Sequence, residues 1–186
     1  MPTPNALACF SRVRSGGFDG AITLVGDEPV PPYQRPPLSK KYLLGDMALE
    51  RLYLKPESFY ADQGIDLVAG APVTAIDRAA REVVLGDRRI AYDTLALTTG
   101  ALPRLLPAAI GGDLAGVYPV RTLADVDAMA PDVTEGRRVL IVGGGYIGLE
   151  AAAVCALKGL RVTLIEMAPR ILQRVASAET ATVIRS

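Results

Sequence analysis

Short apolar runs separated by polar turns make up the first third of the chain. Residues 6–14 have helical spacing and end at two glycines, and residues 21–25 form an apolar run that ends in acidic side chains. This pattern predicts a helix followed by a buried strand. Five prolines then break regular structure as far as Ser39 and Lys40, after which residues 41–44 are expected to start a helix.

The middle of the chain alternates short β-branched runs with turn residues. Four such runs, typical of a small β meander, span residues 65–69, 73–76, 82–85 and 89–92. Residues 95–98 are expected to add another short strand. Prolines and glycines follow in a linker-like stretch, so a domain boundary is expected near Val117.

The last third of the chain has the pattern of a parallel βαβ crossover. Residues 122–130 have helical spacing, with Thr122 placed to cap the helix. Residues 138–142 then form a strand that is apolar from Val139 onward, residues 147–158 an alanine-rich helical segment and residues 161–165 a second strand. A strand, a helix and a strand at this spacing predict two parallel strands and an α/β fold.

Composition narrows the chemistry more than it narrows the fold. The 186 residues are 50% hydrophobic and 22% charged, which is ordinary for a globular protein, and the formal net charge is zero. A neutral chain gives no indication of a nucleic-acid partner or of an anionic membrane surface. The absence of histidine excludes serine-histidine triads and HExxH zinc sites. No metal site is therefore expected.

The two cysteines and the apolar runs bear on the compartment. Cys9 and Cys155 lie far apart and form no CxxC pair, so we expect buried thiols in a reducing cytosol rather than a redox disulfide. No run reaches the roughly 18 apolar residues that would span a bilayer, and the start of the chain lacks signal-peptide features. A cytoplasmic protein with no membrane partner is expected.

Three glycines after the expected strand of residues 138–142 carry the clearest chemical signal. Gly143, Gly145 and Gly148 have the GxGxxG spacing, in which the first makes a tight turn, the second admits a pyrophosphate and the third lets helix and strand approach. The free amides at the helix start, near Tyr146 and Ile147, would face the phosphates. This turn is predicted to bind a dinucleotide.

An acid at the end of the next strand is expected to complete that site. Glu166 lies about 20 residues beyond the glycines, where an acid binds the ribose hydroxyls. Its charge would repel a 2′-phosphate, so NADH is favoured over NADPH. Arg170 lies close enough in the sequence to accept a phosphate, and this keeps NADPH open as an alternative.

Two sequence strings resemble a known family. Gly26-Asp27-Glu28-Pro29 followed by PYQRPPLSK, which ends at Lys40, and GGGYIGLE, which ends at Glu150, resemble the flavoprotein reductases that serve ferredoxins and rubredoxins. These reductases belong to the pyridine nucleotide-disulfide oxidoreductase superfamily. The resemblance implies hydride transfer from NADH to FAD and single-electron transfer to a ferredoxin or rubredoxin-like acceptor.

The same resemblance implies the domain organisation. Residues 1–117 would be an FAD-type domain with a small β meander, and residues 118–186 an inserted NAD-type domain. Both would be incomplete versions of the three-layer Rossmann-like fold.

Single residues can be matched to the roles of the family. Asp27 resembles the acid that meets the FAD ribose, Val73 a backbone contact to the adenine, and Arg121 an arginine that contacts FAD. Lys40 resembles the lysine beside the isoalloxazine ring and Glu150 the glutamate at the nicotinamide-flavin junction, and the two are expected to form a catalytic ion pair. Simpler readings are a turn former for Asp27, a core residue for Val73, and solvated surface charges for Lys40 and Arg121.

The chain also departs from the family pattern. Counting back from Asp27, the first FAD-binding glycines would fall at Met1, Thr3 and Ala6, and none of these is glycine. The chain ends inside a helix that begins near Ala178, so we expect truncation at both ends and an exposed apolar edge along residues 21–25.

These departures leave a second reading open. The alternative is an inactive fragment with at most weak dinucleotide binding. An NADH oxidase or CoA-disulfide reductase is disfavoured, because the region before Pro36 lacks the cysteine that such enzymes use.

Overall fold

The structure, a computed structural model, describes residues 4–185 and divides them into two compact units. The first unit contains residues 4–34 and Leu49–Ala101, and the second contains Arg35–Ala48 and residues 102–185. The sequence pattern predicted a domain boundary near Val117. By contacts, the chain leaves the first unit after Ala101, and the short segment Arg35–Ala48 packs with residues that lie far along the sequence.

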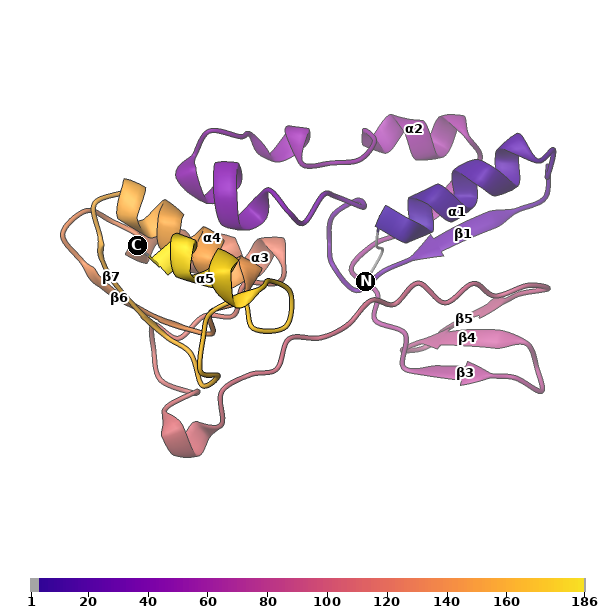
Figure 1. The fold of residues 1–186 in the computed structure, drawn as a ribbon. Helices are drawn as coiled ribbons and strands as arrows, with labels where there is room; N and C mark the ends of the chain where they lie inside the picture. The colour runs from indigo at the N-terminus through magenta and orange to yellow at the C-terminus, as the bar shows by residue number, and fades with distance from the viewer. Residues whose placement is uncertain (1–3, 186) are drawn as a thin grey trace. The chain divides into compact units, whose positions relative to one another are not determined.

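The first unit is built on a parallel strand pair covered by helices. β1 (Ile22–Val25) and β2 (Ile65–Val68) pair in register from Ile22 with Ile65 to Val25 with Val68. In Figure 1, α1 (Pro4–Ser15) runs beside β1. The helix α2 (Glu57–Asp62) precedes β2 and packs against it. These elements enclose a small core of buried side chains, which consists of Leu7, Ile22, Leu24, Tyr60 and Ile65.

The second sheet of this unit is an antiparallel meander. β3 (Ala75–Asp77), β4 (Glu82–Leu85) and β5 (Arg88–Ala91) pair in sequence order. The expectation that residues 65–69 begin this meander was wrong, because they pair in parallel with β1 instead. The strand expected at residues 95–98 was also wrong. Leu97 there is 66% exposed, and the segment has no ladder partner among the described strands.

The outer edge of the first strand pair lacks a ladder partner among the described strands, as expected, but its apolar side chains are not exposed. β1 pairs only with β2 among the described strands, so its other edge has no ladder partner there. Its apolar side chains are nevertheless covered, since Ile22 and Leu24 belong to the buried core.

The second unit contains the predicted crossover. β6 (Arg138–Val142) and β7 (Arg161–Ile165) are parallel, from Arg138 beside Arg161 to Val142 beside Ile165. α4 (Tyr146–Leu157) connects them and packs against both, as Figure 1 shows. The opposite face of the pair is open, with Leu140 59% and Val142 52% exposed. The strand β6 therefore alternates between partly buried and exposed positions.

Shorter elements complete the second unit. α3 (Leu123–Met129) begins at a capping box in which Thr122 and Asp125 each bond the other's backbone N–H. A 3₁₀ turn, η4 (Ala130–Asp132), extends it, and α5 (Ala178–Arg185) follows β7. The segment Arg35–Ala48 contributes a π-helical turn, η1 (Leu38–Tyr42), where the sequence predicted a helix starting three residues later.

The remaining short elements are 3₁₀ turns, η2 (Leu49–Arg51) in the first unit and η3 (Ala108–Ile110) in the second. Within residues 4–185, no helix combines the length and the apolar character that crossing a membrane requires. The fold class is thus α/β, with two parallel strand pairs and one antiparallel meander.

Candidate functional site

The glycine turn joins the end of β6 to the start of α4, and three of its glycines meet different requirements. Gly143 has φ +112°, a conformation that side chains disfavour. A Cβ at Gly148 would lie 2.0 Å from the carbonyl oxygen of Gly143, so only glycine lets the helix start lie against the turn. A Cβ at Gly145 would meet open space, which leaves the backbone there accessible to a phosphate.

A fourth glycine in the turn was missed by the motif. A Cβ at Gly144 would lie 2.8 Å from Cγ2 of Ile171 and 3.3 Å from Cβ of Glu166. The Gly144 N–H donates to Glu166 Oε2 at 2.6 Å, and its carbonyl accepts from the N–H of Leu172 at 2.8 Å. The GxGxxG spacing leaves this position unspecified, so the only signal in the sequence was the run of three glycines.

Glu166 directly follows β7, and its carboxylate accepts hydrogen bonds from the backbone of the glycine turn and of its own loop. Its Oε1 accepts from the N–H of Ala168 at 2.7 Å, while its Oε2 accepts from Gly144. The backbone N–H groups of Ala168 and Gly144 lower the pKa of Glu166 by stabilising the carboxylate. The side chain is therefore charged at neutral pH, and its remaining lone pairs can accept from ribose hydroxyls.

A cavity of about 400 Å³ lies beside Glu166, between β7, the following loop and α5. Arg170 borders this cavity, and its guanidinium donates to the backbone carbonyls of Gln173 at 3.2 Å and Ser177 at 3.4 Å. Those contacts hold the arginine against its own loop. The guanidinium of Arg170, the cation considered for a 2′-phosphate, is thus engaged by its own loop.

Lys40 and Glu150 form the ion pair that the resemblance predicted, which the structure confirms. Nζ of Lys40 lies 2.8 Å from Oε1 of Glu150. The hydroxyl of Ser39 donates to the other carboxylate oxygen, Oε2, at 3.0 Å. Ser39 was quoted only as part of a motif string, so its contact with the carboxylate was missed.

Further side chains hold the segment Arg35–Ala48 within the second unit. Arg35 Nη1 donates to the carbonyl oxygen of Arg121 at 2.6 Å, and the Tyr42 hydroxyl donates to Asp127 Oδ1 at 2.7 Å. Neither Arg35 nor Tyr42 was singled out from the sequence, because each contact joins residues more than 80 positions apart. Contacts of Arg35, Lys40 and Tyr42 therefore fix the segment at Lys40 and on both sides of it.

Arg121 lies two residues before α3, and its backbone N–H donates to Asp125 Oδ2 at 3.0 Å. Its side-chain Nε is buried and has no hydrogen-bond partner in the described part of the chain. Leaving a buried N–H without an acceptor costs roughly 1–3 kcal/mol, so the group fits an acceptor that binds there. Arg121 is thus half-buried, and its role stays a prediction.

Asp27 and Val73 lie in the first unit, at the ends of different sheets. Asp27 is exposed and follows β1, where Gly26 continues the pairing by donating to the carbonyl of Val68 at 3.0 Å. Val73 precedes β3 and is 46% exposed, which contradicts the simpler reading of a core residue. Of the three positions that replace FAD-binding glycines, Met1 and Thr3 lie outside the described residues.

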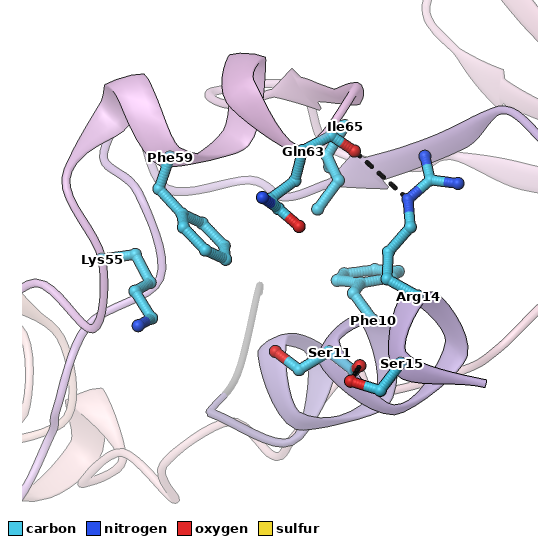
Figure 2. Close-up of a pocket in the computed structure, with 8 residues that line it drawn as sticks. All are labelled: Phe10, Ser11, Arg14, Ser15, Lys55, Phe59, Gln63 and Ile65. Carbon is cyan, nitrogen blue, oxygen red and sulfur yellow. Dashed lines mark hydrogen bonds between the residues drawn. The ribbon is translucent and has the colours of Figure 1, made fainter. Parts of the chain in front are cut away.

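The first unit has a cavity of its own, between α1 and the α2–β2 turn, which Figure 2 shows. Its basic side chains are engaged within the protein. Arg14 donates to four backbone carbonyls, those of Phe18, Gly20, Gln63 and Gly64. Lys55 Nζ lies 5.0 Å from the ring centre of Phe59, a cation-π contact. The cavity has a volume of about 370 Å³, and both of its basic side chains make contacts within the protein. It is therefore not a free cationic site.

Comparison with known proteins places these features in a family. Residues 4–186 match the family model described as pyridine nucleotide-disulphide oxidoreductase. The chain is 46% identical to rhodocoxin reductase from Rhodococcus erythropolis over 167 residues, which cover 89% of the chain and 39% of that protein. It is 44% identical to putidaredoxin reductase from Pseudomonas putida over 166 residues, covering 88% and 39%.

A solved structure agrees with the sequence comparisons. The crystal structure of the covalent putidaredoxin reductase-putidaredoxin complex superposes with a TM-score of 0.92 at 39% identity, over 98% of this chain and 45% of that one. The chain thus spans about two fifths of the length of the relatives it matches. It belongs to the pyridine nucleotide-disulphide oxidoreductase family, as its motifs indicated.

Proposed function

We propose that the chain is the NADH-binding and flavin-facing portion of a reductase that passes electrons to a ferredoxin or rubredoxin-like protein. The observation that carries this proposal is the set of functional residues at the start of α4. Gly145 and Gly148 shape its first turn for a pyrophosphate, and Glu150, two residues later, pairs with Lys40. The helix α4 thus has the nucleotide turn at its start and bears Glu150, the glutamate assigned to the nicotinamide-flavin junction.

The nucleotide side of the proposal depends on backbone groups and one acid. Free N–H groups at the start of α4 would bind the pyrophosphate, and the helix dipole favours negative charge there. The charged Glu166 would accept from the ribose hydroxyls and repel a 2′-phosphate. Arg170 is held by carbonyls of its own loop, which supports NADH as the preferred donor over NADPH.

The flavin side depends on residues carried over from the family. FAD would accept hydride from NADH and release single electrons to the acceptor protein. Lys40 and Glu150 would hold a fixed charge pair where the two rings meet, and Arg121 would offer its unpaired Nε to an acceptor group. Asp27 and Val73, both accessible, are proposed as further FAD contacts.

The names of the relatives support the proposed acceptor. Proteins 37–46% identical to this chain are named as reductases of rhodocoxin and rubredoxin. A small iron-sulfur or rubredoxin-like protein is therefore proposed as the acceptor. The free thiols of Cys9 and Cys155 support the cytoplasm as the proposed compartment.

One observation favours a second candidate, a fragment that binds a dinucleotide weakly and does no redox chemistry. Met1, Thr3 and Ala6 stand where the family has FAD-binding glycines. A side chain at these positions would obstruct the close backbone approach that a pyrophosphate needs. FAD binding is thus the property that separates the two candidates.

The test is a titration of the purified chain with NADH, NADPH and FAD, followed by calorimetry and by the flavin absorbance. The proposal expects tighter binding of NADH than of NADPH, and bleaching of bound flavin on addition of NADH. Gly145→Ala is the matched control, because it places a methyl group in the phosphate space without meeting another atom of the protein. NADH binding without FAD binding would support the fragment, and equal binding by Gly145→Ala would contradict the nucleotide site.

A further inference from the structure

Ser39 is buried beside a charged pair that is itself accessible. Ser39 is 4% exposed, so its hydroxyl is shielded from solvent. The side chains of Lys40 and Glu150 are 45% and 30% exposed. A buried hydroxyl therefore contacts a carboxylate whose other partner is half in solvent.

The two oxygens of the Glu150 carboxylate contact two adjacent residues, Ser39 and Lys40. Oε2 accepts from the Ser39 hydroxyl at 3.0 Å, and Oε1 lies 2.8 Å from Nζ of Lys40. An exposed lysine-glutamate pair alone contributes little, because two long side chains must be ordered to hold one geometry. A hydrogen bond from a buried, short side chain orients the carboxylate without ordering another long one.

The backbone explains how adjacent residues reach the same carboxylate. Side chains of consecutive residues in a regular α-helix diverge by roughly 100°. Lys40 departs from helical geometry with φ −124° and ψ −110°, inside the π-helical turn η1. The interruption directs both Ser39 and Lys40 to Glu150.

We propose that Ser39 is a positioning residue that fixes the Glu150 carboxylate, so that Lys40 is held in one place by the carboxylate. The consequence for hydride transfer rests on the proposed function, because only a bound flavin would be affected by the position of Lys40. The hydrogen bond itself requires no cofactor. The placement of Lys40 can therefore be tested on the chain alone.

The experiment measures how fast an amine-reactive acetylating reagent modifies Lys40, by mass spectrometry of the intact, folded chain. Lys41, which is exposed and adjacent, serves as the internal reference. Ser39→Ala is expected to raise the Lys40 to Lys41 rate ratio by roughly three- to tenfold, as the ion pair loosens. Ser39→Thr keeps a hydroxyl and should restore a low ratio, and Ser58→Ala, an exposed serine on α2, should leave it unchanged.

A double variant separates positioning from general loosening. Glu150→Gln should raise the ratio on its own, and adding Ser39→Ala to it should have no further effect. The proposal is overturned if Ser39→Ala leaves the Lys40 to Lys41 rate ratio unchanged, including the case in which both rates rise equally. Failure to bind NADH or FAD in the titration would remove the proposed function while leaving this result intact.

Discussion

The glycine turn and the Ser39–Lys40–Glu150 cluster lie within one unit but are built in different ways. The turn uses backbone groups of consecutive residues, and its shape depends on the absence of side chains at Gly144 and Gly148. The cluster uses side chains that lie 111 positions apart in the case of Ser39 and Glu150. The turn is therefore a rigid element where added atoms collide, whereas the cluster is an accessible contact that single substitutions loosen.

This difference predicts that the turn tolerates substitution far less than the cluster does. The largest effect is expected for Gly148→Ala, whose Cβ would lie 2.0 Å from a backbone oxygen that cannot move away alone. Overpacking of this kind costs about 1–3 kcal/mol or more in unfolding free energy. NADH binding should fall with it, because the start of α4 must shift. Urea unfolding and NADH titration measure the two effects.

Gly145→Ala is the matched control for that variant, because its Cβ meets no atom within 4 Å. It should unfold at the same urea concentration as the unmodified chain and lose NADH affinity only. If both variants unfold alike, the proposed difference between a packing glycine and a phosphate glycine is wrong.

Glu166→Gln tests whether charge also stabilises the turn. Hydrogen bonds from the N–H groups of Ala168 and Gly144 lower the pKa of Glu166, so its contribution to stability is complete above the ordinary glutamate pKa. That contribution is lost as the pH falls through the lowered value in the folded chain. The stability difference between the chain and Glu166→Gln should therefore shrink on acidification. If the difference in unfolding free energy stays constant from neutral to strongly acidic pH, the charged carboxylate is not the origin of the stabilisation.

Lys40→Met should separate stability from function in the cluster. The pair is exposed enough that the unfolding free energy should change by less than about 1 kcal/mol. Reduction of bound flavin by NADH, followed by its absorbance, should slow by roughly tenfold or more if a fixed charge is needed at the junction. Unchanged flavin reduction would exclude Lys40 from the junction, whatever the stability result.

The smallest effect is expected for Tyr42→Phe, which removes the hydrogen bond to Asp127. This bond is exposed to solvent, so its loss should change the unfolding free energy by about 0.5 kcal/mol. The acetylation ratio of Lys40 to Lys41 should stay low, because Ser39 remains in place. A large rise in that ratio would show that Tyr42, rather than Ser39, determines the position of Lys40.

Local patterns predicted those elements whose contacts are themselves local. Thr122 and Asp125 form the expected cap of α3, since both partners lie within one turn. β6, α4 and β7 were predicted nearly to the residue, because a crossover helix and its strands are contiguous. The prediction failed for residues 65–69, where the choice between β1 and the meander depends on packing against α1 and α2.

The sequence by itself determined the glycine turn, its acid and the family resemblance, because glycine conformation and strand-helix spacing act within a few residues. It also carried the Lys40–Glu150 pairing, though only through that resemblance. The tertiary structure decided that Arg35–Ala48 packs with the second unit, that Glu166 binds Gly144, and that Ser39 is buried against Glu150. These contacts join segments distant in sequence, and their geometry depends on how the whole unit packs rather than on any local preference.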